Sequence, residues 1–278
     1  MRTGMILLLS ITMLIAKEPQ MWTLSSPDKD IRVSVRLQQG RLYYAVAKHN
    51  RELISRSRLG LALAQHPGLT EMLQFERQNR SSHDSTWITV WGENRAIQNQ
   101  YNELKLGFTR GTGQRFDVVF RAFDDGAAFR YQIDRQSGFD SLNIMDELTE
   151  FNIDPESEVW WIPAFAGNRY EYLYRNTRVN TMDTVHTPVT FRTPDHYYLC
   201  VHEAALTDFA SMTLRRTEHN TLKAFLVPWS DGVKVKTKTP MQSPWRTIQI
   251  ADRPGALVES SMILNLNEPN QLQDVSWI

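Results

Sequence analysis

The sequence predicts an all-β protein, a large antiparallel two-sheet sandwich with few short helices. Ile31, Val33 and Val35 alternate with polar residues, which is the period of a strand with one buried face. The sequence Asp-Asp-Gly at residues 124–126 separates two apolar runs and indicates a hairpin, because glycine tolerates a positive φ. No long amphipathic stripe with helical spacing is present, and many strands with little helix are typical of a sandwich.

Two strand pairs are the clearest elements. The first expected strand spans residues 31–37, with its apolar side chains inward and its alternating arginines and serine outward. Residues 38–40 predict a turn, and a return strand begins at Leu42. Residues 115–123 and 127–133 form the second pair. Further strands are expected at residues 59–64, 197–206, 222–228, 232–238, 245–251 and 261–267.

Helix signals are confined to the C-terminal part of the chain. Asp252 is in place to cap a short helix that starts near Pro254. Pro269 opens another expected short helix toward Trp277. Because no repeat period and no low-complexity linker occurs, the sequence after the N-terminus predicts one domain.

The composition excludes several classes of function. The chain has 31 basic and 31 acidic residues and no net charge, which argues against a nucleic-acid binder and a polybasic membrane-surface protein. Cys200 is the only cysteine, so neither an intramolecular disulfide nor a thiolate zinc site can form. Its apolar neighbours favour a buried packing thiol over a nucleophile.

The N-terminus predicts export. Arg2 precedes the almost wholly apolar residues 5–16, a run too short to span a bilayer as a helix. This pattern is typical of a signal peptide, expected at residues 1–16, and favours a bacterial periplasmic location over an extracellular one. A buried strand or helix is the alternative reading of the same run. No other segment approaches the length of a membrane span.

Common catalytic motifs are absent, including GxSxG, the Walker loop and HExxH. His202 and Glu203 fit a hydrogen-bonded pair at a strand end, with a role in a site as the alternative. Glu171 stands in an aromatic segment, where an extended backbone would place the tyrosines of residues 170–174 on one face and Glu171 on the other. Such a carboxylate suits a hydroxyl-rich ligand or a hard cation such as calcium, although a surface glutamate is the simpler reading.

A set of short segments follows one order and spacing from about residue 22 to the end of the chain. The segments are WGE (91–93), IQNQYNEL (97–104), FRAFDDGAAFRY (120–131), WWIP (160–163), YEYLY (170–174), VHEAALTDFASMTL (201–214), PWRTIQI (244–250), LNLNEP (264–269) and SWI (276–278). Together they resemble the N-terminal β-supersandwich domain of family 97 glycoside hydrolases, the bacterial α-glucosidase and α-galactosidase family.

The resemblance implies a site shared between domains. In family 97 this domain precedes a catalytic (β/α)8 barrel, which supplies the catalytic carboxylates and most of the ligands of a calcium ion. The N-terminal domain leans over the mouth of the barrel and contributes one glutamate to that calcium. Alignment on the segments at 160–163 and 170–174 places this ligand at Glu171. The resemblance therefore implies calcium as a cofactor and no catalytic residue in this chain.

The sequence has no βαβα pattern and ends where a barrel would begin. We therefore expect residues 17–278 to be an accessory domain that acts on α-linked oligosaccharides only together with its barrel and is inactive alone. Such a domain is expected to expose an apolar patch, with Trp277, Ile278 and part of residues 160–174 as candidates. The alternatives are a stand-alone module that binds carbohydrate or another protein, and a structural sandwich without a ligand.

Overall fold

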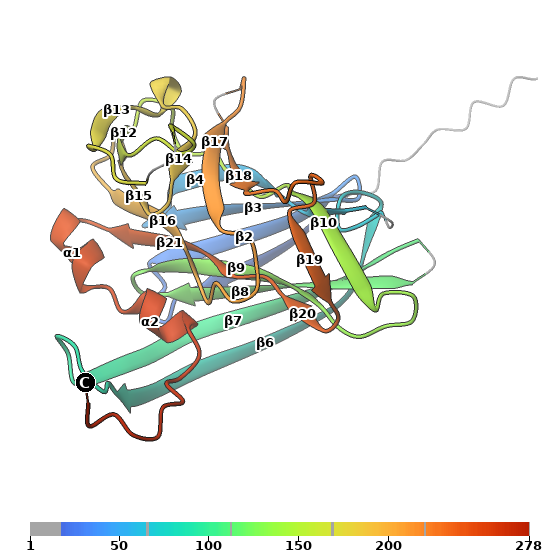
Figure 1. The fold of residues 1–278 in the computed structure, drawn as a ribbon, viewed down its shortest axis with the longest axis horizontal. Coiled ribbons are helices and arrows are strands. Elements are labelled where there is room, and N and C mark those ends of the chain that lie inside the picture. Colours follow the sequence, from blue (N-terminus) through green and yellow to red (C-terminus); the bar gives the residue numbers. More distant parts are fainter. Residues whose placement is uncertain (1–17, 65–66, 112, 168–169, 220, 278) are drawn as a thin grey trace, which may run out of the picture.

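The computed structural model describes residues 18–277, with gaps at 65–66, 112, 168–169 and 220 (Figure 1). The expected signal peptide lies outside the described residues, and so does Ile278. In the part of the chain that is described, no helix has both the length and the apolar character needed to cross a membrane.

Strands dominate the described chain, and the predicted all-β class with few short helices is confirmed. The strands are β1 (Gln20–Ser25), β2 (Ile31–Gln38), β3 (Arg41–Lys48), β4 (Arg51–Leu59), β5 (Leu61–Leu63), β6 (Leu73–Ile88), β7 (Ala96–Arg110), β8 (Gln114–Phe123), β9 (Gly126–Ile133), β10 (Ser141–Glu147), β11 (Glu150–Phe151), β12 (Glu158–Trp161), β13 (Arg175–Arg178), β14 (Val185–His186), β15 (Val189–Arg192), β16 (Tyr198–Ala204), β17 (Met212–Arg216), β18 (Leu222–Leu226), β19 (Val235–Lys238), β20 (Met241–Gln242) and β21 (Trp245–Ala251). The helices are α1 (Pro254–Glu259), α2 (Met262–Leu266) and the short 3-10 turn η1 (Val179–Thr181).

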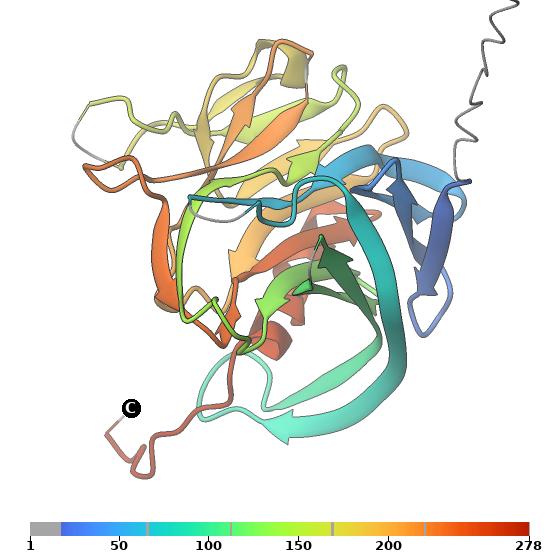
Figure 2. The same cartoon turned by 90° about the vertical axis from the view of Figure 1, so that its right-hand side faces the viewer.

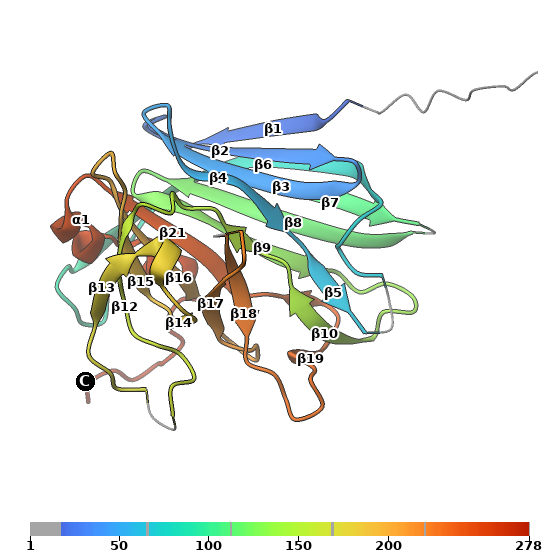
Figure 3. The ribbon, with the colours of Figure 1, turned by 90° about the horizontal axis from the view of Figure 1, so that it is seen from above.

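The described strands pair antiparallel in four sheets. A ten-stranded sheet runs in the order β13-β12-β15-β16-β21-β9-β8-β7-β6, with β20 paired to β9, and is called the large sheet below. The first four strands form a meander that lies over the β7–β9 part of the large sheet (Figure 3). The two smaller sheets, β19-β10-β5 and β11-β18-β17-β14, complete the layer opposite the large sheet.

One contiguous apolar core lies between these layers. The expected alternation in β2 is confirmed, because Ile31, Val33 and Val35 are all buried, while their polar neighbours are exposed or half-buried. Aromatic side chains join the layers, and the rings of Tyr44 in β3 and Phe129 in β9 have centroids 4.9 Å apart. The period-two pattern of the sequence therefore marks the faces that meet in the core.

The two expected hairpins are present, but their glycines have different roles. Between β2 and β3, Gln39 and Gly40 both have positive φ angles of 50° and 71°, as a tight hairpin turn requires. Between β8 and β9, Phe123 pairs with Gly126, which does not have a positive φ. A Cβ on Gly126 would instead lie 2.4 Å from the carbonyl oxygen of Ile248 in β21. The predicted reason for this glycine is wrong: it permits close approach of a neighbouring strand.

The strand expected at residues 261–267 is wrong, since α2 occupies this segment. Met262 and Leu266 are buried against the outer face of the large sheet, whereas Leu264 is 51% exposed. The apolar positions that are buried are four residues apart, which is helical spacing. An apolar residue at 264 made the segment resemble an alternating strand.

The helix expected at Pro254 is confirmed as α1, but its expected cap is wrong. Arg253 holds the N-cap position and makes no capping hydrogen bond with its side chain. Asp252 instead forms an ion pair with Lys48 at the end of β3, at 3.3 Å. Because the Asp252 carboxylate pairs with Lys48, it does not cap α1.

The helix expected from Pro269 toward Trp277 is also wrong. The side chain of Asn270 accepts a hydrogen bond from the backbone N–H of Leu272, and Asp274 accepts one from Ser276. Such local bonds to the backbone two residues on compete with helical hydrogen bonding and favour turns.

The remaining expected strands are present with adjusted ends. The segment 59–64 is divided at Gly60, whose N–H donates to the hydroxyl of Tyr131. The segment 232–238 is a strand only from Val235 onward, since Gly232 turns the chain with a φ of 83°. The expected strands at 197–206, 222–228 and 245–251 correspond to β16, β18 and β21.

Candidate functional site

Glu171 lies on the loop between β12 and β13, at the edge of the large sheet. Trp161 and Arg175 pair where the loop leaves and re-enters the sheet, so the described loop residues, 162–167 and 170–174, project from one edge. The Glu171 side chain is exposed. It lines a surface pocket of about 600 Å³ together with Pro163, Tyr172, Leu173, Tyr174 and Arg175.

Residues 170–174 do not form a strand. The chain turns at Phe165 and Gly167, which have φ angles of 60° and 80°, and β13 begins only at Arg175. Tyr172 lies over the turn, with its hydroxyl 3.1 Å from the position a Cβ on Gly167 would take. Tyr172 therefore packs against the turn, whereas Glu171 is exposed.

The base of the loop is held by buried residues. Trp161 is 3% exposed and donates a hydrogen bond from its indole N–H to Thr177 at 3.0 Å. The guanidinium of Arg175 lies over the Trp161 ring, 5.1 Å from its centroid. Ala164 donates its N–H to the carbonyl of Thr184. Residues 161–163 are thus buried and fix where the loop emerges, while Trp160 is half-buried.

Tyr170 and His186 form an aromatic contact that supports one side of the loop. Their ring centroids are 4.1 Å apart, and the Tyr170 hydroxyl donates to the carbonyl of Thr187 at 3.4 Å. Burial lowers the pKa of His186 and raises the pKa of Tyr170. Both shifts favour the neutral forms, so this contact adds no charge beside Glu171 at neutral pH.

The Glu171 carboxylate is available to a ligand. In the described part of the chain, no ion pair or hydrogen bond holds its side chain. The described residues also contain no group of three or more histidine, cysteine, aspartate or glutamate side chains that is able to hold a metal ion. Calcium takes about 6–8 oxygen ligands, so a calcium ion at Glu171 would need most of its ligands from elsewhere. The structure leaves the Glu171 carboxylate exposed and unpaired at the rim of this pocket.

A contact path leads from the Glu171 loop to a second surface groove. The ring of Phe165 meets that of Phe225 in β18 edge to face, with centroids 5.8 Å apart. The ammonium group of Lys234 lies 4.3 Å from the centroid of the Phe225 ring. Lys234 lines a groove of about 640 Å³ beside Trp229, which is 61% exposed.

These features project to one side of the molecule. The described parts of the β12–β13 loop, the turn between β18 and β19 and the C-terminal segment all extend to the left in Figure 2. The exposed aromatic and apolar side chains expected here are present, with Leu173 at 91%, Tyr174 at 66% and Trp277 at 72% exposure. Trp161 is buried, so only the later part of residues 160–174 contributes to this exposed face.

The expected hydrogen-bonded pair of His202 and Glu203 is not formed. Successive residues of β16 point to opposite faces, so the two side chains are separated. His202 Nδ1 lies 3.3 Å from the Thr187 hydroxyl, and burial lowers the pKa of His202. Glu203 points inward and accepts a hydrogen bond from the backbone N–H of Met212.

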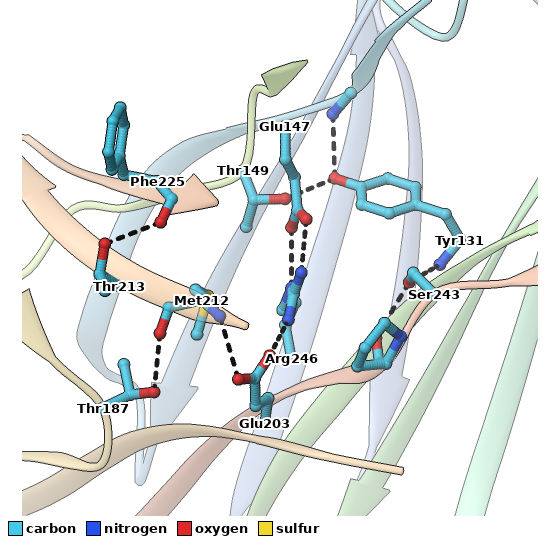
Figure 4. Close-up of polar contacts among 12 residues, drawn as sticks. Tyr131, Glu147, Thr149, Thr187, Glu203, Met212, Thr213, Phe225, Ser243 and Arg246 are labelled. Carbon is cyan, nitrogen blue, oxygen red and sulfur yellow. Dashed lines mark hydrogen bonds and ion pairs between the residues drawn. The ribbon is translucent and has the colours of Figure 1, made fainter. Parts of the chain in front are cut away.

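Glu203 belongs to a buried charged cluster centred on Arg246 (Figure 4). Arg246 is 0% exposed and donates two hydrogen bonds to Glu147, at 2.8 and 2.5 Å, and one to Glu203 at 2.5 Å. Burial raises the pKa of Glu203, and the Arg246 guanidinium opposes this shift. Because every member is paired and enclosed, the cluster has a structural role.

Cys200 is a buried packing thiol, as predicted. Burial raises its pKa to about 11, so the thiol stays protonated at neutral pH. A nucleophile requires the thiolate, which this environment disfavours.

The fold and site define a large antiparallel β-sandwich domain that presents an exposed carboxylate and exposed aromatic side chains. The chain belongs to the glycosyl-hydrolase 97 N-terminal family, whose family model matches residues 24–269. The resemblance drawn from the sequence motifs is therefore confirmed.

Solved structures agree with this assignment. A family 97 glycoside hydrolase from Pseudoalteromonas sp. strain K8, solved with panose and with acarbose, is 39% identical to this chain with a TM-score of 0.89. The match covers 92% of this chain and 39% of that protein. A β-arabinopyranosidase matches at 21% identity and a TM-score of 0.76, over 83% of this chain and 40% of its own, and shows the shared fold alone.

Curated relatives are glycosidases of greater length. A retaining α-galactosidase of Bacteroides thetaiotaomicron is 21% identical, and a probable retaining α-galactosidase of Streptomyces bingchenggensis is 25% identical. Each match covers 92% of this chain but only 42% and 40% of the respective relative. The chain therefore spans about two fifths of the length of the proteins it matches.

Proposed function

We propose that this chain is the N-terminal domain of an exported α-glycoside hydrolase, where it covers a catalytic barrel and donates Glu171 to a calcium ion shared with that barrel. The chain is inactive without the barrel. The observation that carries the proposal is the exposed, unpaired Glu171 carboxylate at the rim of a pocket, on the side where other apolar and aromatic side chains are exposed.

The chemistry of Glu171 fits this role. A carboxylate is a hard oxygen ligand of the kind calcium prefers, and in this chain it is free of basic partners among the described residues. When bound, calcium would supply positive charge close to the sugar. Glu171 would hold the ion at the domain boundary, and the neighbouring aromatic side chains would exclude water from it.

The proposed substrate is an α-linked oligosaccharide acted on by the combined domains. The Pseudoalteromonas relative was solved with panose and acarbose, and the curated relatives are named α-galactosidases. Export is proposed from the apolar N-terminal run at residues 5–16, which has the pattern of a signal peptide.

A domain-replacement experiment tests the proposal. The N-terminal domain of the Pseudoalteromonas enzyme is replaced by this chain, in wild-type form and as Glu171→Gln. The glutamine keeps the size of the side chain and removes its charge. Glu93→Gln is the matched control, because Glu93 is also exposed but lies on the distant β6–β7 loop.

We expect the wild-type chimera and the Glu93→Gln control to hydrolyse an α-glycoside in a calcium-dependent manner. Glu171→Gln should raise the calcium concentration needed for half-maximal activity at least ~10-fold. Disturbing one contact of a metal site typically lowers the metal affinity by this amount. An unchanged calcium requirement in Glu171→Gln would show that this residue is not the ligand. Folded chimeras that are inactive in all three forms would contradict the proposed docking on a barrel.

A further inference from the structure

The turn that carries Trp229 is a second surface feature with the properties of a binding site. Trp229 follows β18, and its backbone N–H donates to the carbonyl of Val233 at 2.8 Å, while Gly232 donates to the carbonyl of Trp229 at 2.9 Å. Val233 is 8% exposed and anchors the turn in the core. The indole is thus held on a closed turn but remains 61% exposed.

Polar groups surround one side of the indole. Lys236 lies over the Trp229 ring, 5.3 Å from its centroid, and forms a 2.6 Å ion pair with Asp231. Asp231 also accepts a hydrogen bond from the N–H of Val233. This pair fixes Lys236 against one face of the ring and leaves donors and acceptors at its edge.

The opposite wall of the groove comes from the loop between β16 and β17. Asp208 is exposed there, has a φ of 50°, and has no ion pair or side-chain hydrogen bond within the described chain. Phe209 forms the adjoining wall, packs against the core, and lies 5.8 Å from the buried Arg246 guanidinium. The groove is therefore lined by the aromatic rings of Phe209 and Trp229 and by the free carboxylate of Asp208.

We propose that this groove binds a pyranose unit of an oligosaccharide, with the indole of Trp229 stacked on the apolar face of the sugar and Asp208 accepting hydrogen bonds from its hydroxyls. Sites for small ligands combine apolar surface with a few placed polar groups, as this groove does. An aromatic side chain offers a large flat apolar area with little loss of conformational freedom. The choice of a sugar as ligand rests on the proposed function.

The Trp229 groove is separate from the Glu171 pocket, but side-chain contacts connect the two. Phe165 and Phe225 lie between the two, and Lys234 contacts Phe225 while lining the groove. The turn between β18 and β19, which carries Trp229, extends to the same side of the molecule as the described parts of the β12–β13 loop, which carry Glu171 (Figure 2). A sugar chain held at Trp229 would extend along this side. The groove would then hold a substrate unit remote from the bond that is cleaved.

The test uses this chain alone, with panose and maltoheptaose as probes and titration calorimetry as the readout. We expect wild type to bind weakly and Trp229→Ala to lose at least ~10-fold in affinity, as truncation of a central aromatic contact typically does. Trp229→Phe should retain part of the binding, and Asp208→Asn should weaken it. Trp91→Ala is the matched control, since Trp91 is 74% exposed on the β6–β7 loop, and it should bind as wild type does.

Equal affinity of wild type and Trp229→Ala would overturn the proposal, as would the absence of binding by wild type. If Trp229→Ala instead weakens only assembly with a barrel, the groove is a protein interface. Circular dichroism and thermal unfolding of each variant identify any loss of folding, and Trp229→Phe keeps the test valid if the alanine variant is unstable. Sugar binding by the isolated chain does not require a barrel or calcium, so this result is independent of the Glu171 experiment.

Discussion

Arg246 and Glu147 form a bidentate ion pair with both side chains fully enclosed. Arg246 belongs to β21 of the large sheet, and Glu147 ends β10 of a smaller sheet, so the pair joins the two layers of the sandwich. Glu203 completes the cluster from β16. A buried charge is tolerated only when its partners are present, so the cluster is sensitive to removal of its centre.

Arg246→Met should therefore be strongly destabilising. It leaves two buried carboxylates without their cation, and breaking such a pair typically costs about 3–5 kcal/mol of unfolding free energy. Glu203→Gln keeps a hydrogen-bonding side chain and leaves Arg246 paired with Glu147, so we expect a loss of only about 1–2 kcal/mol. Urea unfolding followed by tryptophan fluorescence measures both, and equal losses would contradict the central role of Arg246.

The pH dependence of stability provides a second test of this cluster. Burial raises the pKa of Glu203 above its ordinary value of 4.5. The folded state therefore holds a proton that the unfolded state has released, and the contribution of Glu203 to stability decreases as pH rises from 4.5 through the folded-state pKa. The difference in unfolding free energy between wild type and Glu203→Gln should shrink over this interval. A difference that grows with pH would show that Glu203 titrates in the opposite direction.

Sequence periodicity predicted strands with one buried face, such as β2, because burial on one face imposes alternation. It missed β6, which is exposed along almost its whole length and so shows no alternation. It failed at α2, where Leu264 gave the segment the pattern of a strand although only Met262 and Leu266 are buried. The Arg246 cluster was missed because its acidic partners are 99 and 43 residues away in the chain, and nothing local identifies them.

The surface features were predictable in part. Motif alignment pointed to Glu171, whose role stays a prediction, and the structure shows this side chain exposed on the loop between β12 and β13. Trp229 was missed, although a tryptophan between Pro228 and the Ser-Asp-Gly sequence at residues 230–232 is a signal for an aromatic side chain on a turn. Whether such a side chain is exposed depends on the packing of neighbouring strands, which the sequence alone does not give.

Leu173 tests the proposed docking on a barrel. This side chain is 91% exposed, so Leu173→Asp should change the unfolding free energy by less than about 0.5 kcal/mol. A buried charge at an interface is costly, and we expect assembly with the Pseudoalteromonas barrel to weaken at least ~10-fold. Met21→Asp is the control, since Met21 is 54% exposed on β1, on the opposite side from the Glu171 loop (Figure 3). Equal effects of both variants on assembly would place the interface elsewhere.

The isolated chain should not hydrolyse p-nitrophenyl α-glucoside or α-galactoside above background. General acid–base catalysis typically contributes about 10²–10⁴-fold, and the proposal assigns the required acid and base to the barrel. Initial rates with calcium and with a chelator provide the measurement. Calcium-dependent turnover by this chain that survives repeated purification would contradict the proposal that it is inactive alone.

Calcium should have little effect on the isolated chain. Glu171 offers one exposed carboxylate, and the described residues contain no group of three acidic or imidazole side chains to complete a site. A ligand stabilises the folded state only when its concentration approaches or exceeds its dissociation constant. The melting temperature of the chain alone should therefore be the same in millimolar calcium and in chelator.

The chimera with a barrel should melt at a higher temperature in calcium, and Glu171→Gln should reduce this gain. A large calcium-dependent rise for the isolated chain would mean that it holds a complete site of its own, and an undiminished gain in the Glu171→Gln chimera would assign the shared ligand to another residue of the loop.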